Sequence, residues 1–177
     1  MIGGMTRRSV AAVDASFWIH AGMVRNHHEL LGEFDLTVPT TVARELGAPD
    51  SAPSSLSGQA LKVSLDAGNA RIMDPKGPLI AEFHSGEKAV LTLAIEQKPD
   101  LVPLIDETKA YTWAAKKSLP VLSMPLWLAL RSVSGAEDAL TAISKIKALV
   151  AAKHVSMAVA HEPLVLLAGQ LAREGRA

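Results

Sequence analysis

The stretch SVAAVDASFWIHA, residues 9–21, decides the fold class of this chain. Its apolar run, from Val10 to Val13, ends in an acid, Asp14, and Ser16 follows two positions later. A short apolar run of this kind is typical of a strand that is buried on both faces and carries a polar side chain at its carboxyl end. We therefore expect a buried strand, a metal ligand at Asp14, and a helix capped by Ser16.

Strand and helix patterns alternate outward from this stretch over residues 10–130. Further strand candidates are the short apolar runs at residues 35–38, 70–73, 101–105 and 120–122. Helical patterns lie between and after them, at residues 17–24, 40–46, 59–65, 86–97 (capped by Ser85), 108–117 and from 125 onward. This alternation predicts an α/β fold of three layers, α/β/α, around a parallel sheet of about five strands.

Beyond Arg131 the pattern is purely helical. Ser134-Gly-Ala-Glu137 fits a capping box for one helix, and a last helix is expected at about residues 163–173. We expect an α/β unit over residues 1–131 and a helical extension over residues 132–177, packed on the same domain. A chain of 177 residues supports one well-packed core.

The composition limits the classes of function. The 18 Lys and Arg residues balance the 18 Asp and Glu residues, so a nucleic-acid partner needs a local basic patch or bound cations. The absence of cysteine excludes a disulfide scaffold and thiolate metal sites. No apolar run approaches the roughly 20 residues that span a membrane. We expect a soluble, cytoplasmic protein without a membrane partner.

A second strand end repeats the pattern of the first, because the apolar run at residues 101–105 leads directly into Asp106. Ligands of parallel sheets bind beyond the carboxyl ends of the strands. Either aspartate alone is explained by helix capping, whereas a hard cation needs carboxylates that converge from different strands. Glu45 and Glu87 are the natural further members. Their simpler interpretations are an exposed helix acid for Glu45 and a complement to the helix dipole for Glu87.

Several competing motifs are incomplete. Ser85-Gly-Glu-Lys88 matches S-x-x-K, but the S-D-N and K-T-G companions of a serine acyl-enzyme are absent. Neither glycine-rich phosphate loop is present. The six histidines show no zinc-binding spacing, and we expect them at the surface or in loops.

Basic and aromatic residues near the acids are candidates for nucleic-acid contact. Arg44, Lys88 and Lys109 are close in sequence to the acids and are candidate phosphate ligands, although solvated surface charge is the simpler interpretation of each. Trp18 and Trp113 have the ring that stacks on a base, but their places on apolar helix stripes favour the core.

Four passages, taken in order, resemble one known family. They are VAAVDASFWI, VPTTVARELG, SGEKAVLTLAIE and LVPLIDETKAYTWAAKKSLPVLS. They are similar to PIN domains, most closely to predicted nucleic-acid-binding PIN proteins related to the VapC toxins. The likeness covers residues 10–130, and the helical tail is similar to that subgroup's C-terminal extension. The resemblance implies a three-layer fold whose acidic pocket binds Mg²⁺ or Mn²⁺ and cleaves single-stranded RNA, leaving a 3′-hydroxyl.

The resemblance also implies roles for individual residues. The four catalytic acids and metal ligands would be Asp14, Glu45, Glu87 and Asp106, with Glu107 as a neighbouring metal ligand and Ser16 as support for Asp14.

Three positions depart from the family pattern. Tyr111 stands where an arginine is usual, Glu107 replaces a second aspartate, and Ser123-Met124 replaces Gly-Thr. Loss of the arginine removes a phosphate or structural contact.

The leading hypothesis is a Mg²⁺- or Mn²⁺-dependent ribonuclease of PIN type that acts on single-stranded or structured RNA. We expect it to be the toxin of a toxin–antitoxin pair, with a small antitoxin protein as partner. The family and the apolar residues 119–130 favour a homodimer. Two alternatives stay open. One is a non-catalytic PIN-like module that binds RNA or protein, and the other is a receiver-like phospho-acceptor domain, whose required lysine we do not find.

Overall fold

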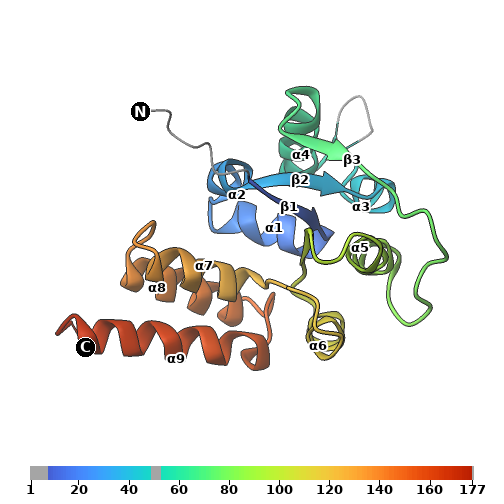
Figure 1. Cartoon of the computed structure of the whole chain (residues 1–177). Helices are drawn as coiled ribbons and strands as arrows, with labels where there is room; N and C mark the ends of the chain where they lie inside the picture. Colours follow the sequence, from blue (N-terminus) through green and yellow to red (C-terminus); the bar gives the residue numbers. More distant parts are fainter. Residues whose placement is uncertain (1–7, 49–52, 177) are drawn as a thin grey trace, which may run out of the picture.

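The computed structural model describes residues 8–48 and 53–176. It has the predicted α/β fold (Figure 1). In chain order the elements are β1 (Ser9–Val13), α1 (Ala15–Met23), α2 (His27–Glu33), β2 (Phe34–Val38), α3 (Thr40–Glu45), α4 (Leu56–Asp66), β3 (Ala70–Ile72), α5 (Ser85–Glu96), β4 (Leu101–Leu104), α6 (Thr108–Lys116), α7 (Met124–Val133), α8 (Ala139–Ala151) and α9 (Met157–Arg173).

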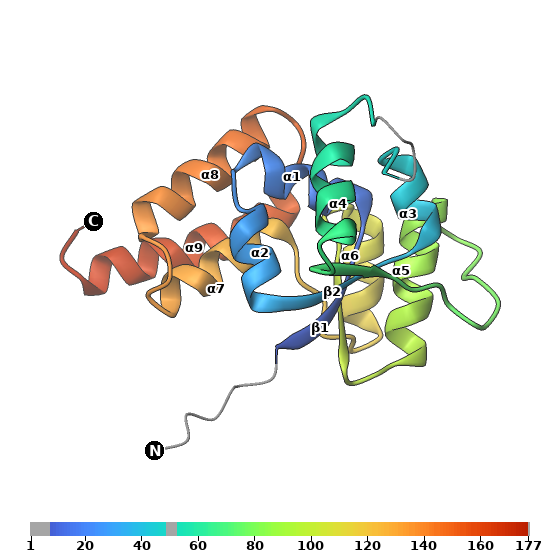
Figure 2. The ribbon, with the colours of Figure 1, turned by 90° about the horizontal axis from the view of Figure 1, so that it is seen from above.

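The four strands form one parallel sheet in the order β3-β2-β1-β4. Because crossovers between parallel strands are right-handed, the connections from β1 to β2 and from β2 to β3 run on one face. The return from β3 to β4 then runs on the other face. Figure 2 shows the strands passing between α2 on one side and α5 on the other. The sheet is therefore the middle layer of three, as predicted.

The fifth strand expected at residues 120–122 does not form. Leu122 makes only an isolated bridge to Leu104, through hydrogen bonds from Ile105 N to Leu122 O (2.9 Å) and from Leu122 N to Pro103 O (3.0 Å). Pro120 lacks an N–H, and the chain enters α7 directly after Ser123, so no length remains for a ladder. The described residues contain a sheet of four strands instead of about five.

The caps of two helices differ from prediction. Asp14, and not Ser16, is the N-cap of α1, because β1 ends at Val13 and the next carboxylate is the first acceptor available. His84, and not Ser85, precedes the first helical residue of α5. In both cases the residue predicted as the cap lies inside the first turn.

The capping box at residues 134–137 was also wrong. Asp138 is the N-cap of α8 and accepts a hydrogen bond from Thr141 N at 3.0 Å, while Glu137 forms an ion pair with Lys145. The last helix begins before Pro163, because Ser156 caps it seven residues earlier, about two turns. The proline is tolerated inside α9, although sequence patterns place it at a helix start.

The second helix, α2, was missed. The cluster Asn26-His27-His28 was expected to end the first helical region, yet Asn26 is the N-cap of α2. Arg25, with a φ of +58°, breaks the chain between the two helices. No sequence pattern pointed to this left-handed residue, since it is not a glycine.

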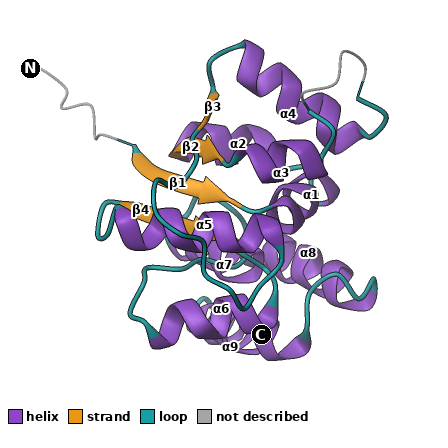
Figure 3. Ribbon diagram, turned by 90° about the vertical axis from the view of Figure 1, so that its right-hand side faces the viewer, coloured by secondary structure: helices purple, strands orange, loops and turns teal. Residues whose placement is uncertain are grey.

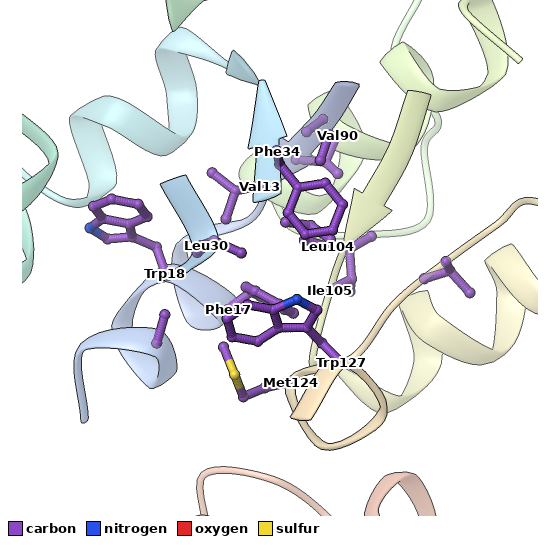
Figure 4. Close-up of a cluster of buried hydrophobic side chains, with 14 of the residues drawn as sticks. Val13, Phe17, Trp18, Leu30, Phe34, Val90, Leu104, Ile105, Met124 and Trp127 are labelled. Atoms are coloured by element: carbon purple, nitrogen blue, oxygen red, sulfur yellow. The ribbon is translucent and has the colours of Figure 1, made fainter. Parts of the chain in front are cut away.

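The core joins the sheet to α1 and α7 (Figure 4). Phe17 of α1 and Trp127 of α7 are buried, with their ring centroids 6.3 Å apart. Trp18 is fully buried, as favoured from the sequence, and its Nε1 donates to Ser57 O at 2.9 Å. Its ring stacks on His27 at 4.1 Å, and burial lowers the pKa of that histidine. His27 is therefore a packing residue and not the surface residue expected.

The C-terminal helices α7, α8 and α9 pack on one another, and α7 also packs on α1. Figure 3 shows them on the lower side of the sheet, beyond β4. Ionic contacts extend this packing, since Arg131 of α7 pairs with Glu33 of α2 and Lys145 of α8 donates to Asn26 Oδ1 at 2.7 Å. None of the helices in residues 8–48 and 53–176 has the length and apolar content needed to cross a membrane.

The position of Phe17 between sheet and α7 gives a stability prediction. We expect Phe17→Ala to lower the free energy of unfolding by about 3–5 kcal/mol, because it removes a large buried ring and leaves a cavity. Leu56→Ala is the control: that side chain is 84% exposed, and its truncation should change stability by less than about 0.5 kcal/mol. Denaturant unfolding measures both, and equal effects would contradict the assigned core.

Candidate functional site

The five predicted acids lie together. They line one cavity of about 300 Å³ at the carboxyl ends of β1 and β4, whose walls are Asp14, Ala15, Ser16, Glu45, His84, Gly86, Glu87, Asp106, Glu107 and His154. Because β1 and β4 are neighbours in the sheet, Asp14 and Asp106 leave adjacent strand ends. Asp14 N donates to Leu104 O at 3.1 Å, which extends the pairing of the two strands to the edge of the cavity.

Asp14 is held by the helix that it caps. Its Oδ2 accepts hydrogen bonds from Ser16 Oγ at 2.5 Å and from Ser16 N at 3.2 Å. Ser16 therefore supports Asp14, the role that the resemblance implied. Burial raises the pKa of Asp14 above 3.8, the bonds from Ser16 oppose the rise, and the nearby charge of Glu45 adds to it. Asp14 caps α1 and also lines the cavity, so its role as a cap does not exclude a role as a metal ligand.

Glu45 is the last residue of α3, and it reaches the start of α5. Its Oε1 accepts hydrogen bonds from Ser85 Oγ at 2.6 Å and from Gly86 N at 3.2 Å. The start of α3 is itself fixed by Asp74, whose carboxylate accepts from Thr40 N at 2.8 Å and from Thr40 Oγ1 at 2.6 Å. One oxygen each of Asp14 and Glu45 is thus held by a serine hydroxyl and a backbone N–H.

The other two oxygens converge above Gly86. A Cβ placed on Gly86 would lie 2.9 Å from Glu45 Oε2, 3.0 Å from Asp14 Oδ1 and 3.1 Å from Val42 Cγ2. Real Cβ atoms essentially never lie closer than 3.0 Å to such atoms. Glycine at position 86 therefore leaves open a space that both carboxylates border. The S-G-E motif showed this glycine, but nothing in the sequence indicated which side chains would face it.

Glu87 and Glu107 complete the acidic wall. Glu87 Oε2 accepts a hydrogen bond from His84 N at 3.2 Å. Burial raises the pKa of Glu87, and the charges of Asp14 and Glu107 raise it further. Glu107 is the N-cap of α6, with Oε2 accepting from Ala110 N at 2.7 Å. Both acids lie next to negative neighbours, so the wall is crowded with like charge.

Asp106 has partners that the sequence did not reveal. Its Oδ2 accepts from His20 Nδ1 at 2.7 Å, and its Oδ1 accepts from Met124 N at 2.6 Å. His20 is buried, which contradicts the expectation that the histidines lie at the surface. One sequence feature could have indicated the burial of His20: it lies three residues after Phe17 and therefore on the same, buried face of α1. Asp106 is therefore a fixed carboxylate that lines the cavity, and each of its oxygens keeps the capacity to accept a further bond.

The acidic wall has few compensating charges. Among the ion pairs of the described residues, one involves an acid of this wall, and it joins Asp106 to His20. Asp14, Glu45, Glu87 and Glu107 take part in none of them. Asp14 and Glu87 have raised pKa values because burial and neighbouring acids disfavour their ionised forms. A bound cation would relieve both the repulsion and the desolvation.

The donor set fits a divalent cation with oxygen ligands. Within the described ranges no three Asp, Glu, His or Cys side chains converge tightly enough to form a complete protein cage. Mg²⁺ does not require one, because it keeps several waters and is bound through one or two carboxylates. Two carboxylate oxygens over Gly86, Asp14 Oδ1 and Glu45 Oε2, would form the cradle for such a cation. Glu87 lines the same cavity.

The other predicted contacts are distributed around the cavity. Arg44 and Lys109 are exposed, and Lys88 is half-buried. Lys109 lines a neighbouring cavity that also touches Glu87 and Glu107. Among the described residues, neither Arg44 nor Lys88 lines the acidic cavity or the neighbouring one.

A family model described as a PIN domain matches residues 13–133. Among solved structures, a PilT N-terminus domain protein from the hyperthermophilic archaeon Sulfolobus solfataricus P2 is similar, with 13% identity and a TM-score of 0.42, over 64% of this chain and 86% of that chain. No match was found among curated proteins.

The raised pKa of Asp14 gives a pH prediction. In metal-free buffer we expect Asp14→Asn to unfold at higher denaturant concentration than the wild type at about pH 7. Asparagine keeps the cap, whereas ionised Asp14 costs stability as the pH rises through its raised pKa. The difference should disappear as the pH falls below 3.8, where the carboxyl is protonated in both states.

Asp138 is a matched control, because it is also an N-cap aspartate but its pKa is lowered, first by the hydrogen bond from Thr141 N and then by Arg176. Its stabilisation exists above 3.8 and is lost as the pH falls through the lowered pKa. Asp138→Asn should therefore destabilise the protein at neutral pH. If both variants shift stability in the same direction, the burial assigned to Asp14 is wrong.

Proposed function

Because this chain belongs to the PIN domain family, we propose that it is a metal-dependent endoribonuclease that hydrolyses RNA phosphodiester bonds. Members of this family are in general nucleases, which supports the reaction class. The observation that carries the proposal is the convergence of Asp14 Oδ1 and Glu45 Oε2 above Gly86, inside a cavity that also holds Glu87 and Asp106.

Asp14 and Glu45 would hold Mg²⁺ or Mn²⁺ together with coordinated waters, and Glu87, Asp106 and Glu107, on the walls of the same cavity, would be further ligands directly or through those waters. When bound, a divalent cation lowers the pKa of a coordinated water, polarises the phosphoryl oxygen and neutralises the charge that develops on the leaving oxygen. The chain itself supplies fixed carboxylates and no side-chain nucleophile.

The supporting contacts orient the acids before any ligand arrives. Ser16 and Ser85 each hold one carboxylate oxygen and leave the other directed over Gly86. His20 and Met124 N fix both oxygens of Asp106. Because these donors come from helix starts and a buried histidine, the acids need little reorganisation during a reaction.

Tyr111, in the position where the family usually has arginine, does not replace that positive charge. It is half-buried, and burial together with the charge of Glu162 raises the pKa of its hydroxyl above 10.0. The side chain is therefore neutral at physiological pH. Phosphate contacts in this protein must come from other residues.

We further propose that the protein is the toxin of a toxin–antitoxin pair and that a small antitoxin protein binds it. Exposed apolar side chains on the C-terminal helices support a protein partner, namely Leu130, Val133, Leu140, Met157, Val165 and Leu166. Residues 119–130 give less support to a homodimer, because most of their large apolar side chains are in the core. The test is whether a short reading frame for a DNA-binding antitoxin lies beside the gene.

A non-catalytic PIN-like module is the main alternative, and it shares the cleft without the reaction. The receiver-like alternative is not favoured, because the lining of the acidic cavity, in the part of the chain described, includes no lysine. An activity measurement separates the first of these from a ribonuclease.

With single-stranded RNA and Mn²⁺, we expect the wild type to cleave and both Asp14→Asn and Glu87→Gln to lose more than about 100-fold of the rate. Chelation of the metal should stop the reaction. Asp138→Asn, outside the site, should cleave at the wild-type rate. Equal cleavage by all four proteins would remove these acids from the site, and no cleavage by the wild type would favour the binding module.

The cradle over Gly86 allows a second test. Gly86→Ala adds a methyl group 2.9 Å from Glu45 Oε2 and 3.0 Å from Asp14 Oδ1, so these side chains must shift by a few tenths of an ångström, and we expect the rate to fall because the two carboxylates lose their alignment. Gly32→Ala is the matched control, since a Cβ there meets nothing within 4 Å. Rates are measured at saturating Mn²⁺, with circular dichroism to verify folding. Full activity in folded Gly86→Ala would contradict the convergence.

A further inference from the structure

The acidic cavity continues along α6 into two others. A cavity of about 270 Å³ shares His84, Glu87 and Glu107 with it. A third cavity, of about 390 Å³, shares Glu82, Phe83 and Lys109 with the second. Since each cavity shares walls with the next, the three lie in a row from the acids to the far end of α6, and we call this row the groove.

Trp113 lies at the far end of this groove. Sequence patterns favoured the core for it, but it is half-buried, whereas Trp18 and Trp127 are 0% and 2% exposed. The ring centroids of Trp113 and Phe83 lie 5.7 Å apart with an interplanar angle of 76°, which is an edge-to-face arrangement. Trp113 also lines the third cavity. Phe83 thus supports the indole while part of it stays open to the groove.

The charge changes sign along the groove. The first cavity is lined by acids, and the third by Lys109 and Lys116 with Glu82 as its acid. Lys117 Nζ lies 5.7 Å from the centroid of the Trp113 ring. The hydroxyls of Thr108 and Thr112 add hydrogen-bonding groups to the same wall.

An aromatic ring flanked by lysines and hydroxyls is the chemistry that binds single-stranded nucleic acid, because the base stacks and the backbone phosphates meet the cations. An acidic peptide would use the lysines but not the open ring. Trp113 follows Glu107 by six helical residues, about 9 Å along the axis of α6. It would therefore meet a nucleotide next to the scissile one.

We propose that Trp113 stacks on the base of a nucleotide that flanks the scissile phosphate, with Lys109 and Lys116 contacting the backbone between them. The assignment rests on the proposed function for the identity of the strand as RNA. The RNA strand would then run from the acids along α6. Trp113 would bind the strand and would not be a catalytic residue.

Binding of a fluorescently labelled eight-nucleotide RNA to the full chain carrying Asp14→Asn tests this assignment, because that background does not consume the RNA. Adding Trp113→Ala should weaken binding between about fivefold and 150-fold, the range for one stacked base. Trp113→Phe keeps a ring and should recover most of the affinity. Val165→Ala, on α9 and 58% exposed, should bind like the parent.

Oligonucleotides with one abasic position identify the stacked base. At that position the parent should lose affinity, and Trp113→Ala should lose little more, because the two changes remove the same contact. RNA should also quench the tryptophan emission of the parent and not that of Trp113→Phe.

Equal affinities for parent and Trp113→Ala, or losses that add at every abasic position, would overturn the assignment. So would a parent that binds no RNA. The proposed function fails separately: if Trp113→Ala loses affinity but wild type cleaves no RNA with Mn²⁺, the groove stands and the ribonuclease does not. If the wild type cleaves RNA and Trp113→Ala has the same KM as the wild type, the ribonuclease stands and the stacking role of Trp113 does not.

Discussion

Two carboxylate oxygens that face each other over a glycine are the constraint on which the rest of the site depends. Asp14 Oδ1 and Glu45 Oε2 both border the space in front of Gly86, 3.0 Å and 2.9 Å from where a Cβ would lie. Like charges at this separation repel, and burial of Asp14 increases the cost. The fold therefore anchors the second oxygen of each acid, with Ser16 and Ser85 as donors. A cation between them would turn the repulsion into binding energy.

The neutral net charge of the chain conceals a segregation of charge. Acids gather at the carboxyl ends of β1 and β4, while lysines of α6 line the far end of the same groove. Without metal, the acids would repel a polyanion such as RNA, whereas the lysines would attract it. With metal bound at the acids, both ends of the groove attract phosphate, and the strand has one preferred path. The binding of metal and of nucleic acid should thus be coupled.

Much of the fold and the identity of the acids could be predicted from the sequence. Apolar runs that end in Asp14 and Asp106 revealed two strand ends, and adjacent parallel strands bring such residues together. The partners of these acids could not be predicted. His20 and Met124 reach Asp106 from 86 and 18 residues away, and no local pattern encodes contacts of that range. The partial exposure of Trp113 could not be predicted either. An apolar stripe shows which side of a helix can be buried, but whether another element covers that side depends on contacts that are distant in sequence.

The central claim is that the carboxylates above Gly86 form the cation site of this protein. The most direct measurement is a crystal structure of crystals soaked in Mn²⁺, with anomalous scattering used to locate the ion. We predict an anomalous peak between Asp14 and Glu45, at the edge of the cavity that Glu87 lines, and no such peak in crystals of Gly86→Ala. An empty cradle in well-ordered wild-type crystals at saturating Mn²⁺, or an ion held elsewhere in the chain, would contradict it.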